Sequence, residues 1–194
     1  MANELKGVRV AFLVSNEGIE QAELTAPWQA VKDAGGTPDL IAPESGEVQA
    51  FNHLDKGDTF PVDRTFSAAN PADYQAAVVP GGVANSDFLR TVPEAVSFIK
   101  QIFEAGKPAA VICHGPWLLV EADLLHDRVL TSWPSLQTDL RNAGASWVDT
   151  EVQICPAGPN TLITSRKPDD LPAFCRKMVE EFAEGEDPRQ HAAG

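Results

Sequence analysis

Short apolar runs rich in β-branched residues alternate with amphipathic segments along most of this chain, and this rhythm constrains the fold more than any other feature. The first run, residues 8–14, is typical of a buried strand, and residues 20–34 follow it with apolar side chains at helical spacing. The alternation predicts an α/β, flavodoxin-like, doubly wound fold with a mostly parallel sheet and helices on both faces. We expect strands at residues 8–14, 39–42, 76–80, 109–113 and 162–165, and helices at residues 20–34, 93–105, 116–125, 134–143 and 171–182.

One interval, residues 47–70, interrupts this rhythm. Residues 48–54 and 59–66 have strand character and flank residues 55–58, whose sequence Asp-Lys-Gly-Asp is typical of a turn. We therefore predict a hairpin that protrudes from the sheet. No internal repeat or second domain is visible, so we expect a single domain over residues 1–194, with its core at residues 8–182 and a flexible tail at residues 184–194.

Charge and composition argue against several classes of partner. The formal net charge is −13, whereas a nucleic-acid-binding protein needs a basic face for phosphates. No apolar run approaches the roughly 18 residues of a membrane span, and the N-terminus lacks the pattern of a signal peptide. Three cysteines, Cys113, Cys155 and Cys175, are too few for a disulfide framework. We expect no nucleic acid, no membrane and a reduced, cytoplasmic location.

The strongest chemical signal lies where the strand at residues 109–113 meets the next helix. Cys113 ends the strand, and His114, Gly115 and Pro116 lead into the helix. In a doubly wound fold the thiol then lies at the carboxyl edge of the sheet, where ligands bind, and the helix N-terminus should favour the thiolate. Gly115 is expected to leave room for a substrate. The alternative interpretation is a buried apolar cysteine without chemistry, which is what we expect of Cys155 and Cys175.

Two further elements could supply groups to this thiol. Gly81 and Gly82 follow a buried strand, and their backbone N–H groups could form an oxyanion hole. Glu20 and Glu23 lie three positions apart at the start of the first helix, so they should share a face from which a carboxylic acid could reach the thiol. The alternative is that acids simply suit a first helical turn.

Together these elements resemble the PfpI family of intracellular proteases, glyoxalases and deglycase-like stress proteins, within the class I glutamine amidotransferase-like superfamily. The resemblance covers residues 8–182. The matching motifs are Glu-x-x-Glu-Leu before a proline at 20–27, Val-Pro-Gly-Gly at 79–82, Ile-Cys-His-Gly-Pro at 112–116 and Thr-Ser-Arg-Lys-Pro-Asp-Asp-Leu-Pro-Ala-Phe at 164–174. By this resemblance, the nucleophile, its base, the carboxyl group against the sulfur and the oxyanion loop would be Cys113, His114, Glu23, and Gly81 with Gly82.

The resemblance also implies an acid that a neighbouring subunit lends, which here matches Asp87. Because His114 directly follows Cys113, we expect its side chain to point away from the thiol and to need an acid from elsewhere to orient it. We therefore expect a homodimer or higher oligomer in which Asp87 of one chain meets His114 of another. The alternative is that Asp87 merely lies at the start of a local helix.

The function that the resemblance implies is a cofactor-independent cysteine enzyme of stress defence that acts on carbonyl groups. Its substrate would be a small carbonyl compound such as methylglyoxal, or a glycated protein or peptide, with peptidase, deglycase and glyoxalase activity left open. The alternative is a redox-sensing or holdase protein in which Cys113 is oxidised without turnover. A glutamine amidotransferase is not expected, because neither His126 nor His191 stands in a His-x-Glu sequence, and the histidine spacing predicts no metal site.

Overall fold

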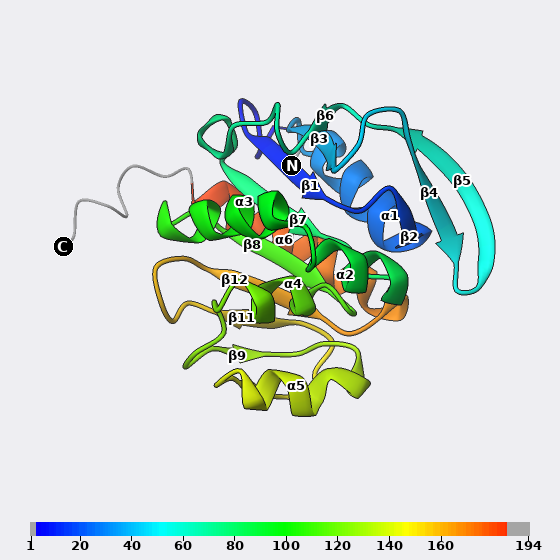
Figure 1. Cartoon of the computed structure of the whole chain (residues 1–194). Helices are drawn as coiled ribbons and strands as arrows, with labels where there is room; N and C mark the ends of the chain where they lie inside the picture. The colour runs from blue at the N-terminus through cyan, green and yellow to red at the C-terminus, as the bar shows by residue number, and fades with distance from the viewer. Residues whose placement is uncertain (1–2, 186–194) are drawn as a thin grey trace.

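A computed structural model describes residues 3–185 and has a seven-stranded sheet at its centre (Figure 1). The spatial order of its strands is β11-β12-β8-β7-β1-β3-β6, and every neighbouring pair is parallel except β11 with β12. The bounds are β1 Arg9–Leu13, β3 Thr37–Ala42, β6 Arg64–Thr65, β7 Ala76–Val79, β8 Ala109–Ile112, β11 Gln153–Cys155 and β12 Leu162–Ser165. The five main strands, numbered along the chain, lie in the order 2-1-3-4-5 of flavodoxin-like folds, so the predicted fold class is confirmed.

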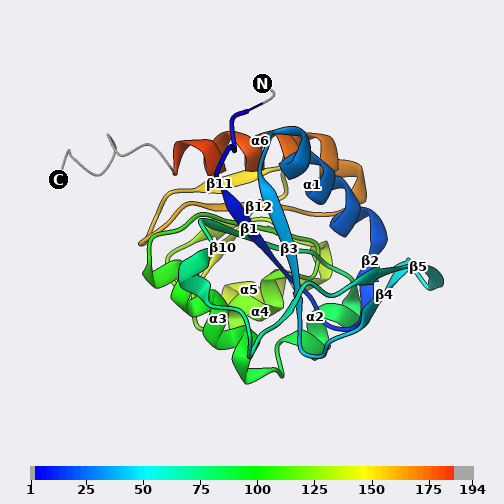
Figure 2. The ribbon, with the colours of Figure 1, turned by 90° about the horizontal axis from the view of Figure 1, so that it is seen from above.

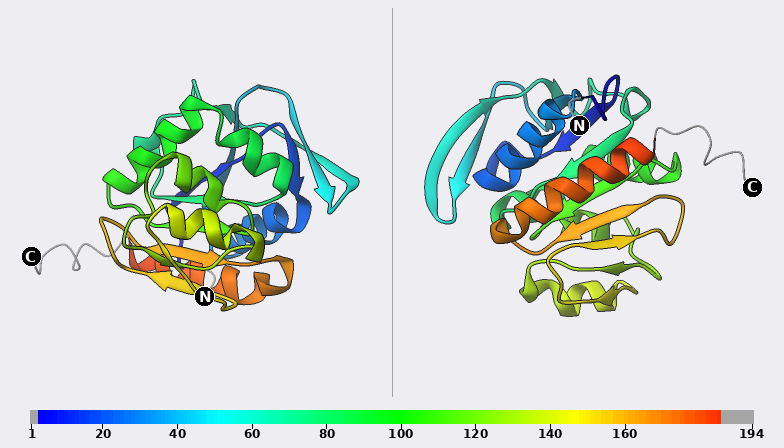
Figure 3. Two further views of the ribbon diagram at one scale, coloured as in Figure 1. Left: turned by 60° about the horizontal axis from the view of Figure 1, so that its bottom comes forward. Right: turned by 180° about the vertical axis from the view of Figure 1, so that it is seen from behind.

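Helices cover both faces of this sheet (Figures 2 and 3). Helices α1 (Gln21–Asp33) and α6 (Leu171–Glu184) pack on one face, and α3 (Pro93–Glu104) and α4 (Pro116–Glu121) on the other. Because neither face meets water, the central strands β7 and β8 are apolar at every position, which explains the continuous runs in the sequence.

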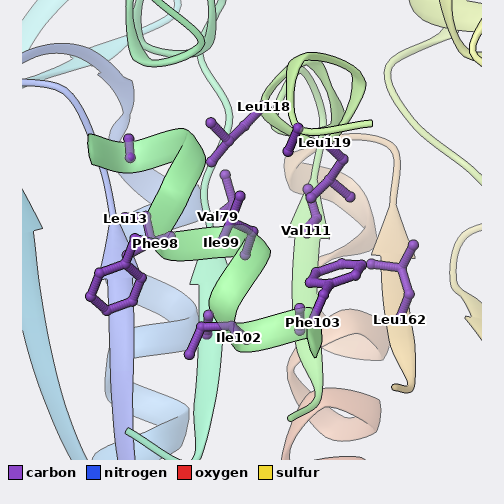
Figure 4. Packing of buried hydrophobic residues seen from close by; sticks show 14 of the residues in the cluster. Leu13, Val79, Phe98, Ile99, Ile102, Phe103, Val111, Leu118, Leu119 and Leu162 are labelled. Carbon is purple, nitrogen blue, oxygen red and sulfur yellow. The ribbon is translucent and has the colours of Figure 1, made fainter. Parts of the chain in front are cut away.

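The core beneath α3 shows how the helical spacing in the sequence is used (Figure 4). Phe98, Ile99, Ile102 and Phe103 all point from one side of α3 onto the strands, and each is at most 2% exposed. The core on the other face contains the alternate strand residues together with side chains of α1 and α6. The two cores hold the carboxyl ends of β1, β7 and β8 side by side.

The predicted hairpin is present, but its turn is not where we expected it. Strands β4 (Glu47–Asn52) and β5 (Asp55–Pro61) are antiparallel, and β2 (Glu17–Glu20) joins β4 to make a small three-stranded sheet beside the main one. The turn is at His53 and Leu54, and residues 55–58 belong to β5. Gly57 lies close to the side chain of Gln21, whose Oε1 accepts a hydrogen bond from Asp58 N–H at 2.7 Å.

Short elements account for the other differences from prediction. Helix α2 (Val83–Leu89) was considered only as a local helix at Asp87, and β6 falls within the strand predicted at residues 59–66. Strands β2, β11 and a small pair formed by β9 (Val129–Leu130) and β10 (Ser146–Trp147) were not expected. The helix expected at residues 134–143 begins as a 3-10 turn, Pro134–Leu136, before α5 (Gln137–Asn142). Two further 3-10 turns are Pro71–Asp73 and Pro168–Asp170. Strands of two residues, such as β9 and β10, are too short for periodicity to reveal.

Helix α6 continues to Glu184, and the rest of the predicted tail, residues 186–194, lies outside the described residues. Between residues 3 and 185, none of the helices combines the length and the hydropathy that crossing a membrane requires.

Candidate active site

Cys113 lies at the corner between β8 and α4, at the carboxyl edge of the sheet. Its φ of 63° is in the left-handed region, which costs a residue with a side chain roughly 1–2 kcal/mol. Two hydrogen bonds hold this backbone in place: the Cys113 N–H donates to Ser165 O at 3.0 Å, and Trp133 N–H donates to Cys113 O at 2.9 Å. The strained corner places the thiol beside the loop after β7, since a Cβ on Gly81 would lie 3.0 Å from Cys113 Sγ.

Glu23 meets this thiol from the first turn of α1. Its side chain is fully buried, its Oε2 accepts a hydrogen bond from Gly81 N–H at 2.8 Å, and the carboxyl group lies against the Cys113 thiol. No nitrogen or oxygen in the described structure bonds to Oε1. Burial raises the pKa of Glu23 to about 8, so at neutral pH this group is a protonated acid that can donate to the sulfur.

Glu20 does not share this role, and the expectation that both glutamates lie on one helical face is wrong. Glu20 is the last residue of β2 and has extended backbone, so it precedes the helix that carries Glu23. Its carboxylate accepts a hydrogen bond from the backbone N–H of His53, with 3.1 Å to Oε2. Glu20 therefore holds the turn of the hairpin.

The two glycines after β7 serve different partners. The Gly82 N–H donates toward the Cys113 sulfur, whereas the Gly81 N–H is already used by Glu23. A Cβ on Gly81 would lie 2.3 Å from Glu23 Oε2 and 2.6 Å from Cys113 Cβ, so only glycine fits between them. The second donor toward the sulfur is the backbone N–H of His114, which we did not predict, although a strand-to-helix junction commonly exposes such amides.

His114 also approaches the sulfur with its side chain, so the expectation that the imidazole points away is wrong. Its Nδ1 lies 3.1 Å from Cys113 Sγ. The ring stacks on Trp133 with 5.7 Å between centroids and meets the edge of Trp117 at 5.3 Å. Burial lowers the pKa of His114 to about 4, so at neutral pH the imidazole is uncharged and can accept a proton.

The thiol itself is not made acidic by the helix N-terminus, contrary to expectation. Burial and the charge of an ionised Glu23 raise the pKa of Cys113, and the N–H groups of Gly82 and His114 only partly oppose this. Helix α4 has six residues, so its dipole is short. The resting site therefore contains a neutral thiol, a neutral imidazole and a neutral carboxyl group.

The position of Gly115 does not fit its expected role. The space beside Gly115 is filled by protein, since a Cβ there would lie 2.7 Å from Val79 O and 2.8 Å from Val111 Cγ1. Gly115 thus permits close packing and does not open a substrate space. Asp87 is exposed on α2 and forms no hydrogen bond or ion pair within residues 3–185, so it is not part of this chain's own site.

No group of three or more His, Cys, Asp or Glu side chains suited to a metal ion occurs in the described part of the chain. The groups gathered at Cys113 are instead a nucleophile, a proton acceptor, an acid and two backbone donors. This set is typical of covalent catalysis at a carbonyl carbon.

A flavodoxin-like sheet with a cysteine at a strand-to-helix corner and a buried glutamic acid against its sulfur defines a class of cysteine-centred α/β proteins. The chain belongs to the DJ-1/PfpI family, whose model matches residues 8–181.

Curated relatives match over most of their length. Deglycase PfpI of Pyrococcus furiosus is 35% identical over 172 residues, which are 89% of this chain and 98% of that protein. Protein/nucleic acid deglycase 2 of Escherichia coli is 35% identical, with 88% and 95% covered. General stress protein 18 of Bacillus subtilis is 39% identical, with 82% and 90% covered.

Solved structures agree on the fold. A two-domain protein of Anabaena variabilis with DJ-1/ThiJ/PfpI-like and ferritin-like domains superimposes with a TM-score of 0.83 at 29% identity, over 92% of this chain and 49% of that chain. Schizosaccharomyces pombe DJ-1 gives a TM-score of 0.76 at 23% identity, over 92% and 96%.

Proposed function

We propose that this protein is a cysteine-dependent enzyme that adds the Cys113 thiol to carbonyl substrates, as a deglycase, glyoxalase or peptidase of stress defence. The observation that carries the proposal is the 3.1 Å approach of His114 Nδ1 to Cys113 Sγ. A neutral thiol needs a base in contact with it, and a neutral imidazole at hydrogen-bond distance supplies one. The relatives named deglycases and the general stress protein support the same class of function.

The geometry supports a first step by general base catalysis. The Sγ–carbon bond forms as the thiol proton moves to His114 Nδ1, and the carbonyl electron pair moves onto oxygen. The N–H groups of Gly82 and His114, which already face the sulfur, are placed to donate to that oxygen. Protonated Glu23 keeps negative charge away from the reacting sulfur. The imidazolium then returns its proton to a departing amine or to the adduct, which is where the three activities diverge.

The redox-sensing or holdase alternative has less support. A sensor cysteine needs an accessible thiolate, whereas Cys113 is 6% exposed and burial raises its pKa. An imidazole in contact with the sulfur also has a use in turnover that a sensor does not require.

We propose further that the active form is an oligomer in which Asp87 of one chain approaches His114 of another. Val83 and Phe88 lie near Asp87 on α2 and are 56% and 55% exposed, so this helix offers apolar side chains that a second chain could cover. His114 Nε2 makes no hydrogen bond within residues 3–185, so it can receive an outside acid. Inactive Asp87→Ala and Cys113→Ser chains should regain activity when mixed, and no recovery in proven mixed oligomers would contradict this.

Steady-state turnover of methylglyoxal, a glycated peptide and a peptide substrate tests the enzyme proposal. We expect the wild type to consume at least one of them, and Cys113→Ser and His114→Ala to lose that activity while staying folded. Cys175→Ser is the matched control, because Cys175 lies on α6 away from the corner. Turnover that survives in Cys113→Ser would contradict the proposal.

A further inference from the structure

Asn85, on α2, is a fully buried polar side chain that no step of the proposed chemistry uses. Its Oδ1 accepts a hydrogen bond from Ser15 N–H at 2.7 Å, and its Nδ2 donates to Gly81 O at 3.0 Å and to Pro80 O at 3.3 Å. A backbone N–H can only donate and a carbonyl can only accept, so these partners fix which end of the amide is which. Asn85 therefore ties the glycine loop to the end of β1.

The two carbonyl groups that Asn85 holds belong to the peptide units whose N–H groups serve the active site. In a trans peptide unit the C=O of one residue and the N–H of the next lie in one plane and point in opposite directions. The described chain has no cis peptide bond. Fixing Pro80 C=O therefore aims the Gly81 N–H, and fixing Gly81 C=O aims the Gly82 N–H.

Those N–H groups are the ones that meet Glu23 and the Cys113 sulfur. Without Asn85, the remaining hold on Gly81 O is a single backbone hydrogen bond from Glu20 N–H at 3.4 Å, which is long. Glycine has no side chain to restrict rotation of its peptide units, so two glycines in succession need an outside anchor.

We propose that Asn85 is a positioning residue that orients the Gly81 and Gly82 peptide planes. It thereby directs the Gly82 N–H toward the Cys113 sulfur and the Gly81 N–H toward the carboxyl group of Glu23. The inference deepens the proposed function, since the same Gly82 N–H would face the substrate oxyanion. Its physical effect on the thiol exists without any substrate.

The test compares Asn85→Asp and Asn85→Ala with the wild type by the pH dependence of iodoacetamide alkylation at Cys113, read by mass spectrometry. Asn85→Asp keeps the shape and the acceptor for Ser15 but loses both donors. We expect the thiol pKa to rise by about one unit in Asn85→Ala, because a lost donor destabilises the thiolate, and by at least as much in Asn85→Asp, whose carboxylate adds a negative charge. We also expect kcat to fall by about 10- to 100-fold, less than the loss when an oxyanion donor is removed outright, with KM little changed.

Asn160→Ala is the control for ordinary loss of stability. Asn160 is also buried and hydrogen-bonded, but to Arg128 and Lys107. This variant should lower Tm without moving the Cys113 alkylation profile. An unchanged thiol pKa in folded Asn85 variants would overturn the inference even if the wild type turns over substrate. Conversely, a shifted pKa with no turnover of any carbonyl substrate would uphold it and reject the proposed function.

A measurement on the wild type covers the case in which the variants do not fold. With ¹⁵N-labelled asparagine, the Asn85 side-chain NH₂ should exchange with water as slowly as that of buried Asn160 and far more slowly than that of exposed Asn70. Exchange as fast as at Asn70 would overturn the inference.

Discussion

The molecule contains two buried cysteines in polar surroundings, and only one of them lies in a setting suited to chemistry. Around Cys113 the neighbours Glu23 and His114 are groups that gain and lose protons, and both have strongly shifted pKa values. Around Cys155 the neighbour is Arg128, 2% exposed, a permanent cation whose guanidinium donates to Asn160 O at 2.8 Å and lies 5.4 Å from the Phe103 ring centroid.

This difference shows that burial of polar groups does not by itself mark a functional site. The Arg128 cluster satisfies fixed donors with fixed acceptors, as a structural network must. The thiol, imidazole and carboxyl group at Cys113 together carry fewer protons than they could bind. One carboxyl oxygen, Glu23 Oε1, has no nitrogen or oxygen partner within residues 3–185. Shared protons at a strained corner are the feature that distinguishes it.

The largest expected difference between the two regions is in turnover. Cys113→Ser should reduce kcat/KM by about 1,000-fold or more, because the nucleophile acts together with its base. Cys155→Ser should change kcat/KM by less than about twofold and lower stability by about 1–2 kcal/mol, since a hydroxyl replaces a buried sulfur. Kinetics and thermal unfolding of both variants provide the measurement. Equal losses of activity in the two variants would show that Cys113 is not distinguished from Cys155 by its chemistry.

A second prediction concerns the Arg128 cluster, where a substitution should lower stability and leave activity unchanged. Arg128→Met should destabilise the protein by about 3 kcal/mol, because it leaves Asn160 O and Cys155 O buried without their donor. The activity per folded molecule should stay near that of the wild type. Urea unfolding, with activity measured at low urea, separates the two effects. A loss of kcat in fully folded Arg128→Met would show that the clusters are coupled.

A third prediction concerns how stability depends on pH. The pKa of Glu23 is raised by burial from an ordinary value near 4.5 to about 8, so the folded state binds this proton more tightly than the unfolded state. The resulting stability is present below pH 4.5 and is lost as pH rises toward 8, with a slope of at most about 1.4 kcal/mol per pH unit. Glu23→Gln should flatten this part of the curve. A wild-type and a Glu23→Gln curve of equal slope between pH 5 and 8 would contradict the assignment.

Much of the fold and part of the site could be predicted, because they depend on local patterns. The strand at residues 109–113 followed by His114 and a helix locates the thiol from adjacent residues, and the fold then brings α1 to it. Helical spacing alone does not separate Glu20 from Glu23, because it cannot show that the helix begins after Glu20, and only the family resemblance singles out Glu23.

The unpredicted features depend on contacts between distant segments. Asn85 has no distinguishing local pattern, because its importance comes from the carbonyl groups of a loop and from Ser15, 70 positions away. Trp133 reaches His114 from beyond β9 and could not be paired with it from spacing. Gly57 suggested a turn, although it lies within β5 and the turn falls at His53 and Leu54. Where a residue is chosen for a distant partner, the local pattern misleads or says nothing.

The smallest expected effect concerns Trp133, whose ring stacks on His114. It tests whether this contact sets the protonation of the imidazole. Burial lowers the pKa of His114 to about 4, and the stacked Trp133 ring is part of what excludes water from the imidazole. Protonated His114 cannot accept the thiol proton, so activity should fall on the acid side with a midpoint near this pKa. Trp133→Ala opens the imidazole to solvent and should move the midpoint upward by about one pH unit, toward the ordinary histidine value near 6.5.

The rate at pH 7 should change little in Trp133→Ala, because the imidazole remains mostly neutral there. Trp147→Ala is the matched control: its indole N–H donates to Ser132 Oγ at 3.0 Å, one residue from Trp133, but its ring does not contact His114. The pH dependence of kcat/KM for both variants decides the matter. If the acid limb moves equally in the two, the shift comes from loosening of the loop; if it moves in neither, Trp133 does not set the protonation of His114. A shift confined to Trp133→Ala means that an aromatic side chain keeps the imidazole of this site neutral. The Arg128 cluster has no such group, because none of its members has to change its protonation.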